Sequence, residues 1–368
     1  MSIALPRLGY EQAELVMELQ VTSISFIFEF ILLSSLLTAL LGWGSIHLSN
    51  RIGLVDMPNS APHKQHGIPT PIAGGIALYG SLLLTAWWTG IYRNPNLVAM
   101  YVAALPVFLF GLWDDFREIS PLMKLLGQSL AVIILISMGV SIKVFESPEF
   151  FYSFPGQFNV YLDWLLTYLW IVGIINAFNF VDSMDGLALG LAGMATTFFI
   201  LVTLDAGQPI LSRQSALLLG TCIGLYFFNS PPAKLFLGDS GAQTLGFVLA
   251  VLAIAYRPLG AFQSSSWVVP IMLLGVPIFD TVLVVLSRIR RGKPIYSASR
   301  DHTYHRLVAM GWSSGKAVLI MQVVALLLGC LAFIVLSRPP LVANGIFIAV
   351  ILVGTVALVY LDNRKQWV

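Results

Sequence analysis

Long apolar runs alternate with short polar loops along most of this chain. The hydrocarbon core of a bilayer requires about 20 largely apolar residues per helix, whereas a transmembrane barrel shows alternating segments of about ten residues. Because the runs are continuously apolar, we predict an all-α integral membrane protein, a polytopic bundle of about 11 transmembrane helices. The expected spans are 23–48, 71–90, 97–112, 121–141, 161–175, 186–206, 212–229, 241–256, 266–288, 314–336 and 341–361.

The composition also indicates a membrane protein. Of the residues, 57% are apolar and 10% are charged, whereas a typical water-soluble domain has about 25% charged residues. Residues 1–22 carry three glutamates and one arginine, the wrong charge for a signal peptide, so we expect an N-terminal extracytoplasmic segment. A transmembrane transferase domain over 23–361 and a short cytoplasmic tail over 362–368 would follow. Cys222 and Cys330 lie inside apolar spans, which favours core positions over a disulfide.

The distribution of positive charge predicts the orientation. With eleven spans, the odd-numbered loops and the C-terminus share one side, which carries fourteen of the 20 Lys and Arg residues; the other side carries six. Loops rich in Lys and Arg stay in the cytoplasm. Five loops with unusual polar residues all fall on the richer side. We therefore expect a multi-pass plasma-membrane protein with a cytoplasmic-face active site.

Carboxylates and a lysine mark two of these loops. Asp114 and Asp115 end the third span in WDDFREI, and Lys124 lies in the first turn of the fourth span. Adjacent carboxylates repel unless a cation relieves them. Beside a lysine they suit a phosphate site, in which Lys binds phosphate and Asp removes a proton or holds Mg²⁺, although a solvated helix end is the simpler alternative. In FLGDSG, Asp239 is either a helix N-cap or part of the same site. Phe236 is either a core residue or a residue that stacks on a nucleobase.

The loop NAFNFVDSMDGLALG places Asn176, Asn179, Asp182 and Asp185 three residues apart. On a helix this spacing keeps them within one broad sector. Polar side chains at a membrane boundary are costly and functional by default, although one of the two aspartates could instead cap the sixth span.

The loop RIRRGKPIYSASRDHTYHRL contains His302, His305 and Arg306, which can project together and bind a diphosphate or a sugar. A metal site with two histidines is the alternative, although zinc usually takes a third strong ligand. The basic run from Arg288 to Lys293 is expected to anchor the ninth span at anionic headgroups. Asp280, inside that span, is either functional or pairs helices.

The first polar loop contributes two features. Lys64, between two histidines, is either a residue beside lipid headgroups or a ligand contact. The pair Gly74-Gly75 opens the second span, where it would let the backbone approach a ligand or let two helices pack closely.

These motifs carry a resemblance. The ordered set WDDFREI, NAFNFVDSMDGL, FLGDSG and HTYHR resembles the polyprenyl-phosphate N-acetylhexosamine-1-phosphate transferases, over about Asp56 to Gly311. Each motif alone is weak, but four in order at loop ends on one membrane face are specific. Tyr304 stands where the family's His-x-His-His motif commonly has its middle His, so the resemblance assigns no obligatory proton transfer to Tyr304 and leaves His302 and His305 to carry that motif.

The resemblance implies the reaction. A UDP-N-acetylhexosamine, above all UDP-GlcNAc, gives its sugar-1-phosphate to undecaprenyl or another polyprenyl phosphate and releases UMP. The lipid-linked diphosphate sugar then starts cell-wall polysaccharide synthesis. The implied cofactor is Mg²⁺ or Mn²⁺. Membrane lipids are expected as partners and nucleic acid is not, while a homodimer is left open.

The resemblance also assigns roles by residue. Asp114 and Asp115 form the catalytic pair, one of which deprotonates or orients the acceptor phosphate, and Asn179 and Asp239 are the metal ligands. The residues expected to contact substrate, with Phe236 stacked on uracil, are Lys64, Lys124, Asp182, Asp185, Phe236, His302, His305 and Arg306.

Three alternatives stay open. The phospho-MurNAc-pentapeptide transferase is the nearest, and HTYHR, DDFRE and the eleventh span favour the GlcNAc branch over it. An ion-coupled transporter would hold its carboxylates near the midplane at broken helices, whereas here they lie at loop ends. A non-catalytic membrane scaffold would not need ordered carboxylates.

The orientation can be tested by cysteine accessibility. We expect Ser60→Cys, Ser120→Cys and Ser297→Cys to react with a membrane-impermeant thiol reagent only after cells are opened, because parity places all three in the cytoplasm. Ser147→Cys, on the opposite side by the same parity, should react in intact cells. If one of the first three is labelled from outside and the others are not, the predicted helix order is wrong.

Overall fold

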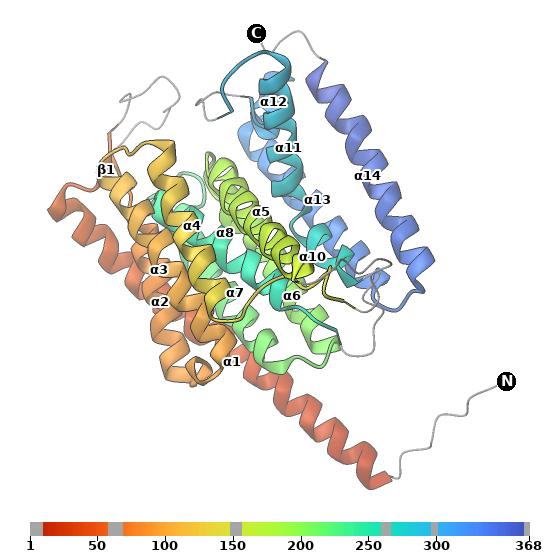
Figure 1. Cartoon of the computed structure of the whole chain (residues 1–368). Helices are drawn as coiled ribbons and strands as arrows, with labels where there is room; N and C mark the ends of the chain where they lie inside the picture. The colour runs from red at the N-terminus through yellow and green to blue at the C-terminus, as the bar shows by residue number, and fades with distance from the viewer. Residues whose placement is uncertain (1–9, 58–68, 148–156, 259–265, 296–300, 364–368) are drawn as a thin grey trace.

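The computed structural model describes residues 10–57, 69–147, 157–258, 266–295 and 301–363, with side chains from residue 25 onward (Figure 1). Most of these residues are helical, so the all-α class is confirmed. The helices are α1 (Tyr10–Ile52), α2 (Gly74–Thr89), η1 (Ile91–Arg93), α3 (Pro95–Phe116), α4 (Pro121–Ser137), α5 (Phe158–Val181), α6 (Leu187–Asp205), α7 (Pro209–Asn229), α8 (Gly238–Ala255), α10 (Val268–Leu273), α11 (Gly275–Arg290), α12 (Thr303–Ala309), α13 (Ser314–Val335) and α14 (Pro340–Asp362). Two short strands, β1 (Val55–Asp56) and β2 (Thr70–Pro71), pair antiparallel.

Each expected apolar span lies on one of these helices or, for the ninth, on a pair of them. Within the described part of the chain, eight helices are long and apolar enough to cross a membrane: α1 from Ser25, α3, α5, α6, α7, α8, α13 and α14. The second and fourth spans form shorter helices: α2 has 16 residues and ends at Gly90, whose φ of 72° is left-handed, and α4 has 17 residues. Only glycine adopts that conformation without strain.

The ninth expected span is divided into α10 and α11 at Leu274. Pro277 lacks the backbone N–H that would continue the ladder to the preceding turn. The interruption therefore follows from the sequence, although the apolar pattern alone predicts one continuous helix. The sixteen residues of α11 carry Asp280 and Arg288 to the end of the bundle at which α12 lies (Figure 1).

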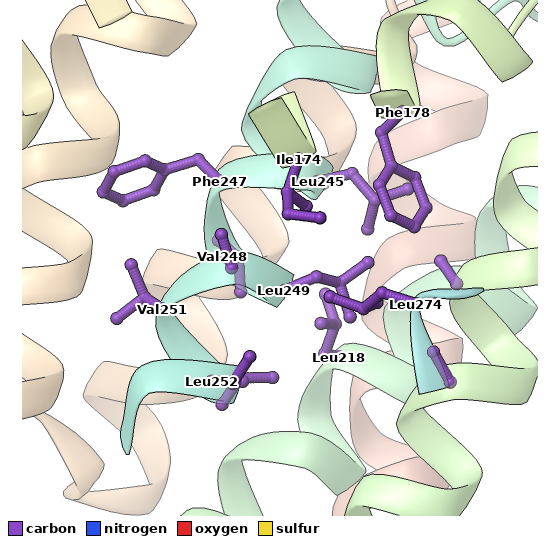
Figure 2. Close-up of a cluster of buried hydrophobic side chains, with 14 of the residues drawn as sticks. Ile174, Phe178, Leu218, Leu245, Phe247, Val248, Leu249, Val251, Leu252 and Leu274 are labelled. Carbon is purple, nitrogen blue, oxygen red and sulfur yellow. The ribbon is translucent and has the colours of Figure 1, made fainter. Parts of the chain in front are cut away.

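Helix α8 lies at the centre of the bundle, and every residue from Ser240 to Ile254 is buried. Figure 2 shows its apolar side chains packed against Ile174 and Phe178 of α5, Leu218 of α7 and Leu274. Inside a membrane such contacts stabilise mainly through close packing, since lipid tails are as apolar as leucine. By contrast, α14 buries only Ala343 and Leu361 and lies at the edge of the bundle in Figure 1.

Glycines let three helix ends meet at the first turn of α8. A Cβ on Gly75 would lie 2.1 Å from Ser240 Oγ, and a Cβ on Gly111 would lie 2.6 Å from Ser240 Cα. Gly74 N–H donates to the carbonyl of Phe236 at 3.0 Å. Of the two uses expected for Gly74-Gly75, the structure therefore has the close packing of backbone. This packing brings the loops before α2 and α8 and the end of α3 together.

Candidate active site

Three charged side chains from three helices form one ion-pair network. Asp114 lies in the last turn of α3, Lys124 in the first turn of α4 and Asp239 in the first turn of α8. Lys124 Nζ is 2.8 Å from Asp114 Oδ2 and 2.6 Å from Asp239 Oδ2. The structure thus joins residues that the sequence analysis placed in two separate loops.

The second aspartate of the pair faces the start of α8. Asp115 accepts the backbone N–H groups of Asp239 at 2.7 Å and Ser240 at 3.1 Å, as well as the Ser240 hydroxyl. Groups of this kind at a helix N-terminus have no partner within their own helix, and a carboxylate there also interacts favourably with the helix dipole. Asp239 itself lies inside the first turn, after the N-cap Leu237, so the reading of Asp239 as the N-cap is wrong.

A chain of amides lies behind Asp239. Gln243 Nε2 donates to Asp239 Oδ2 at 3.0 Å, Gln128 Nε2 donates to Gln243 Oε1 at 3.1 Å, and Asn176 Nδ2 donates to Gln128 Oε1 at 3.0 Å. Both glutamines are 2% exposed. Neither glutamine is among the site residues expected from the sequence, although a glutamine inside an apolar span is itself a signal. The chain fixes the Asp239 carboxylate with contacts from α4, α5 and α8.

The third loop lies within electrostatic range of this network. Burial, together with the negative charges of Asp239, Asp115 and Asp185, raises the pKa of Asp182 well above its usual value. Asp185 Oδ2 accepts the N–H of Ala233 at 3.0 Å, which ties this loop to the one before α8. Asp182 directly follows α5 as its C-cap residue.

The remaining predicted residues have separate positions. Asn179 is half-buried in the last turn of α5. Phe236 is half-buried, and its backbone N–H donates to the carbonyl of Pro71 at 2.8 Å, which pairs the fourth loop with β2. Lys64 falls in 58–68, outside the described residues.

The fifth loop contacts the third through Tyr304, which is fully buried. Its hydroxyl donates to Ser183 Oγ and lies 3.0 Å from His305 Nε2. Burial raises the pKa of Tyr304, so the hydroxyl keeps its proton at neutral pH. His302 Nδ1 lies 2.9 Å from Asp280 Oδ2, which gives Asp280 a partner that the sequence left undetermined.

Arg306 is fully buried, and protein groups surround its guanidinium. Nε donates to the Asp301 carbonyl at 2.7 Å, Nη1 to the Leu361 carbonyl at 3.0 Å, and Nη2 to Ser287 Oγ at 2.8 Å. These contacts join α11, α12 and the end of α14. The geometry therefore gives Arg306 a role inside the protein, in contrast to the expected contact with a diphosphate or sugar.

Arg288 also points inward. It is 2% exposed and binds both Asp301 oxygens, through Nε at 3.1 Å and Nη2 at 2.9 Å. The expectation that Arg288 anchors the ninth span at lipid headgroups is therefore wrong, because a buried bidentate carboxylate holds its guanidinium. Arg290, two residues later, is half-exposed and pairs with Asp362 at 2.8 Å.

The chemistry of the carboxylates fits a divalent cation. Asp114 and Asp239 share the ammonium of Lys124, and the negative charges of Asp239, Asp115 and Asp185 act on Asp182, so a divalent cation would relieve the repulsion among these carboxylates. Their oxygens are the hard ligands that Mg²⁺ prefers. Among the described residues, no three His, Cys, Asp or Glu side chains form a ready cage.

Comparison with known proteins gives the family. The model of glycosyl transferase family 4 matches residues 97–257. A probable undecaprenyl-phosphate N-acetylglucosaminyl 1-phosphate transferase of Bacillus subtilis (strain 168) is 33% identical over 78% of this chain and 78% of its own length. A decaprenyl-phosphate N-acetylglucosaminephosphotransferase of Mycobacterium tuberculosis (strain ATCC 25618 / H37Rv) is 31% identical over 86% and 84%.

A phospho-N-acetylmuramoyl-pentapeptide-transferase of Limosilactobacillus fermentum (strain NBRC 3956 / LMG 18251) is 29% identical over 71% of this chain and 82% of its own length. The identity is lower and the coverage of this chain smaller than for the two N-acetylglucosamine enzymes. This chain belongs to glycosyl transferase family 4, as a member of its polyprenyl-phosphate N-acetylhexosamine-1-phosphate transferases.

The internal role of Arg306 can be tested by thermal unfolding of the purified protein. We expect Arg306→Met to lower the stability by about 1–3 kcal/mol, because it leaves buried acceptors without a donor. Arg117→Met is the matched control, since Arg117 is exposed at the end of α3. An unchanged unfolding midpoint for Arg306→Met would show that the contacts of Arg306 with α11 and α14 contribute little to stability. It would then favour the expected contact of Arg306 with the substrate.

Proposed function

We propose that this chain transfers N-acetylhexosamine-1-phosphate, in the first place GlcNAc-1-phosphate, from a UDP-sugar to undecaprenyl or another polyprenyl phosphate. The observation that carries the proposal is the network in which Lys124 lies between Asp114 and Asp239, at the ends of three apolar helices. It suits the meeting of two phosphates at the membrane surface. The functions named for the 33% and 31% identical relatives support the same reaction.

We infer that the network faces the cytoplasm and that eleven helical segments cross the membrane. The excess of Lys and Arg in the loops on this side supports the orientation. A cytoplasmic site has direct access to a water-soluble UDP-sugar, while the headgroup of the lipid acceptor lies at the same level. The product would supply cell-envelope polysaccharide synthesis with its first lipid-linked sugar.

In the proposed reaction, an oxygen of the polyprenyl phosphate attacks the phosphorus attached to the sugar. The bond from this phosphorus to the oxygen that bridges to UMP breaks, and UMP leaves with the electron pair. Lys124 offsets charge where the anions meet. We assign Asp114 to take the acceptor's proton or to orient its phosphate. Its Oδ1 accepts the N–H of Ile119 at 2.9 Å and its Oδ2 pairs with Lys124, whereas both oxygens of Asp115 accept from the N-terminus of α8.

Asn179 and Asp239 would hold Mg²⁺ or Mn²⁺, which when bound neutralises phosphate charge. The amide chain that ends at Gln243 keeps the Asp239 carboxylate in place. On the donor side, we assign the nucleotide and sugar contacts to Lys64, Asp182, Asp185, Phe236, His302 and His305, with Phe236 against the uracil.

The direct test combines purified protein, undecaprenyl phosphate and Mg²⁺ with UDP-GlcNAc, UDP-GalNAc, UDP-glucose or UDP-MurNAc-pentapeptide. We expect UMP and a lipid-diphosphate-GlcNAc of the corresponding mass, and no product after EDTA treatment until Mg²⁺ is restored. Product from UDP-MurNAc-pentapeptide alone would move the chain to the pentapeptide branch. Full turnover in EDTA would exclude the metal.

The carboxylates are separable by mutation. We expect Asp239→Asn and Asp114→Asn each to cut UMP release by about 10²-fold or more, the order seen when one key electrostatic group is lost, with little change in unfolding midpoint. Asp115→Asn should instead lower the stability by about 0.5–2 kcal/mol, as loss of a helix cap does. Near-normal turnover of a folded Asp114→Asn protein would contradict its assignment.

A further inference from the structure

A buried carboxylate inside α11 binds a histidine of the fifth loop. Asp280 is fully buried, and His302 is 7% exposed. Asp280 Oδ2 lies 2.9 Å from His302 Nδ1, and Asp280 Oδ1 accepts the backbone N–H of Thr303 at 2.6 Å. The carboxylate therefore holds both the ring and the backbone at the start of α12.

Aromatic contacts fix the plane of the same ring. Tyr304 stacks on His302, with ring centroids 5.8 Å apart and planes within 8°. Phe180 meets the ring edge-on at 5.6 Å. Phe180 directly follows Asn179 and precedes Asp182 by two residues, so these contacts place His302 against the third loop.

The hydrogen bonds also determine which ring nitrogen can meet a ligand. Asp280 Oδ1 accepts the Thr303 N–H and Oδ2 lies beside His302 Nδ1, so an ionised Asp280, which can only accept, favours the tautomer with the proton on Nδ1. Nε2 has no hydrogen-bond partner among the residues that the structure describes. A carboxylate behind Nδ1 stabilises the imidazolium that forms when Nε2 takes a proton.

We propose that Asp280 is a positioning residue, which orients His302 so that Nε2 faces the diphosphate of the UDP-sugar. The inference rests on the proposed transferase function. With a proton on Nε2, the ring donates to the charge that develops on the leaving phosphate of UMP. Asp280 touches no substrate and acts only through the imidazole.

The test measures UMP release with UDP-GlcNAc titrated at saturating lipid. In Asp280→Asn, the amide oxygen can still accept from Thr303, and its NH₂ then donates to His302 Nδ1, which reverses the tautomer. We expect kcat to fall roughly 10–100-fold, as for other carboxylates that support a functional histidine, with a smaller change in KM. In His302→Ala protein, adding Asp280→Asn should cause no further loss.

Asp163→Asn is the matched control. Asp163 is also a fully buried carboxylate, in α5, and accepts the N–H groups of Val144, Phe145 and Glu146 at 2.9–3.0 Å. Its kinetics should match those of wild type. If Asp280→Asn behaves like Asp163→Asn, or if its loss persists in full without His302, the inference is overturned. If wild-type protein releases no UMP from any UDP-sugar, the proposed function fails instead.

A second measurement reads the tautomer directly and does not depend on enzyme activity. Nitrogen-15 NMR of wild-type protein with labelled histidine rings reports the tautomer of each neutral imidazole, and His302→Gln identifies the signal. We expect His302 to carry its proton on Nδ1. A neutral ring protonated on Nε2 instead would overturn the inference, whatever the activity.

Discussion

The hydrogen bonds from the first turn of α8 to the Asp115 carboxylate are the constraint on which the rest of the site depends. The first N–H groups of a helix have no partner within their own helix, and Asp115 supplies both oxygens to those at the start of the central helix. That bond places Asp239 beside Lys124 and Asp114. Gly75 and Gly111 make it possible, since a side chain at either position would collide with Ser240.

Adjacent, identical residues thus have different tasks. Asp115 accepts two backbone N–H groups and a hydroxyl at the start of α8, whereas Asp114 accepts one backbone N–H, that of Ile119, and pairs with Lys124. The same division occurs in the fifth loop. Arg288 and Arg306 form charge-assisted bonds inside the protein, and His302 keeps one nitrogen without a protein partner among the described residues. The buried ion pairs and hydrogen bonds of Arg288 and Arg306 hold this loop in one conformation. The His302 ring can therefore keep a defined orientation.

The fifth loop also illustrates what a polar motif leaves undetermined. In HTYHR, polarity and spacing suggest that Arg306 faces a ligand. Its acceptors are the carbonyls of Asp301 and Leu361, the hydroxyl of Ser287 and the carboxylate of Asp362, and all but Asp301 are distant from Arg306 in the sequence. Polarity at a membrane boundary indicates that a residue has a partner, but it does not distinguish a substrate from another helix.

The sequence by itself determined the helical class, the order of the apolar segments and the motifs that identify the family, because span length and motif spacing are local properties of the chain. Only the tertiary structure decided which aspartate caps α8, that Gln128 and Gln243 support Asp239, and that Asp280 binds His302. Asp115 and Asp239 are 124 residues apart. The direction of each carboxylate depends on donors that distant helices bring to it, and that information appears only when the helices pack.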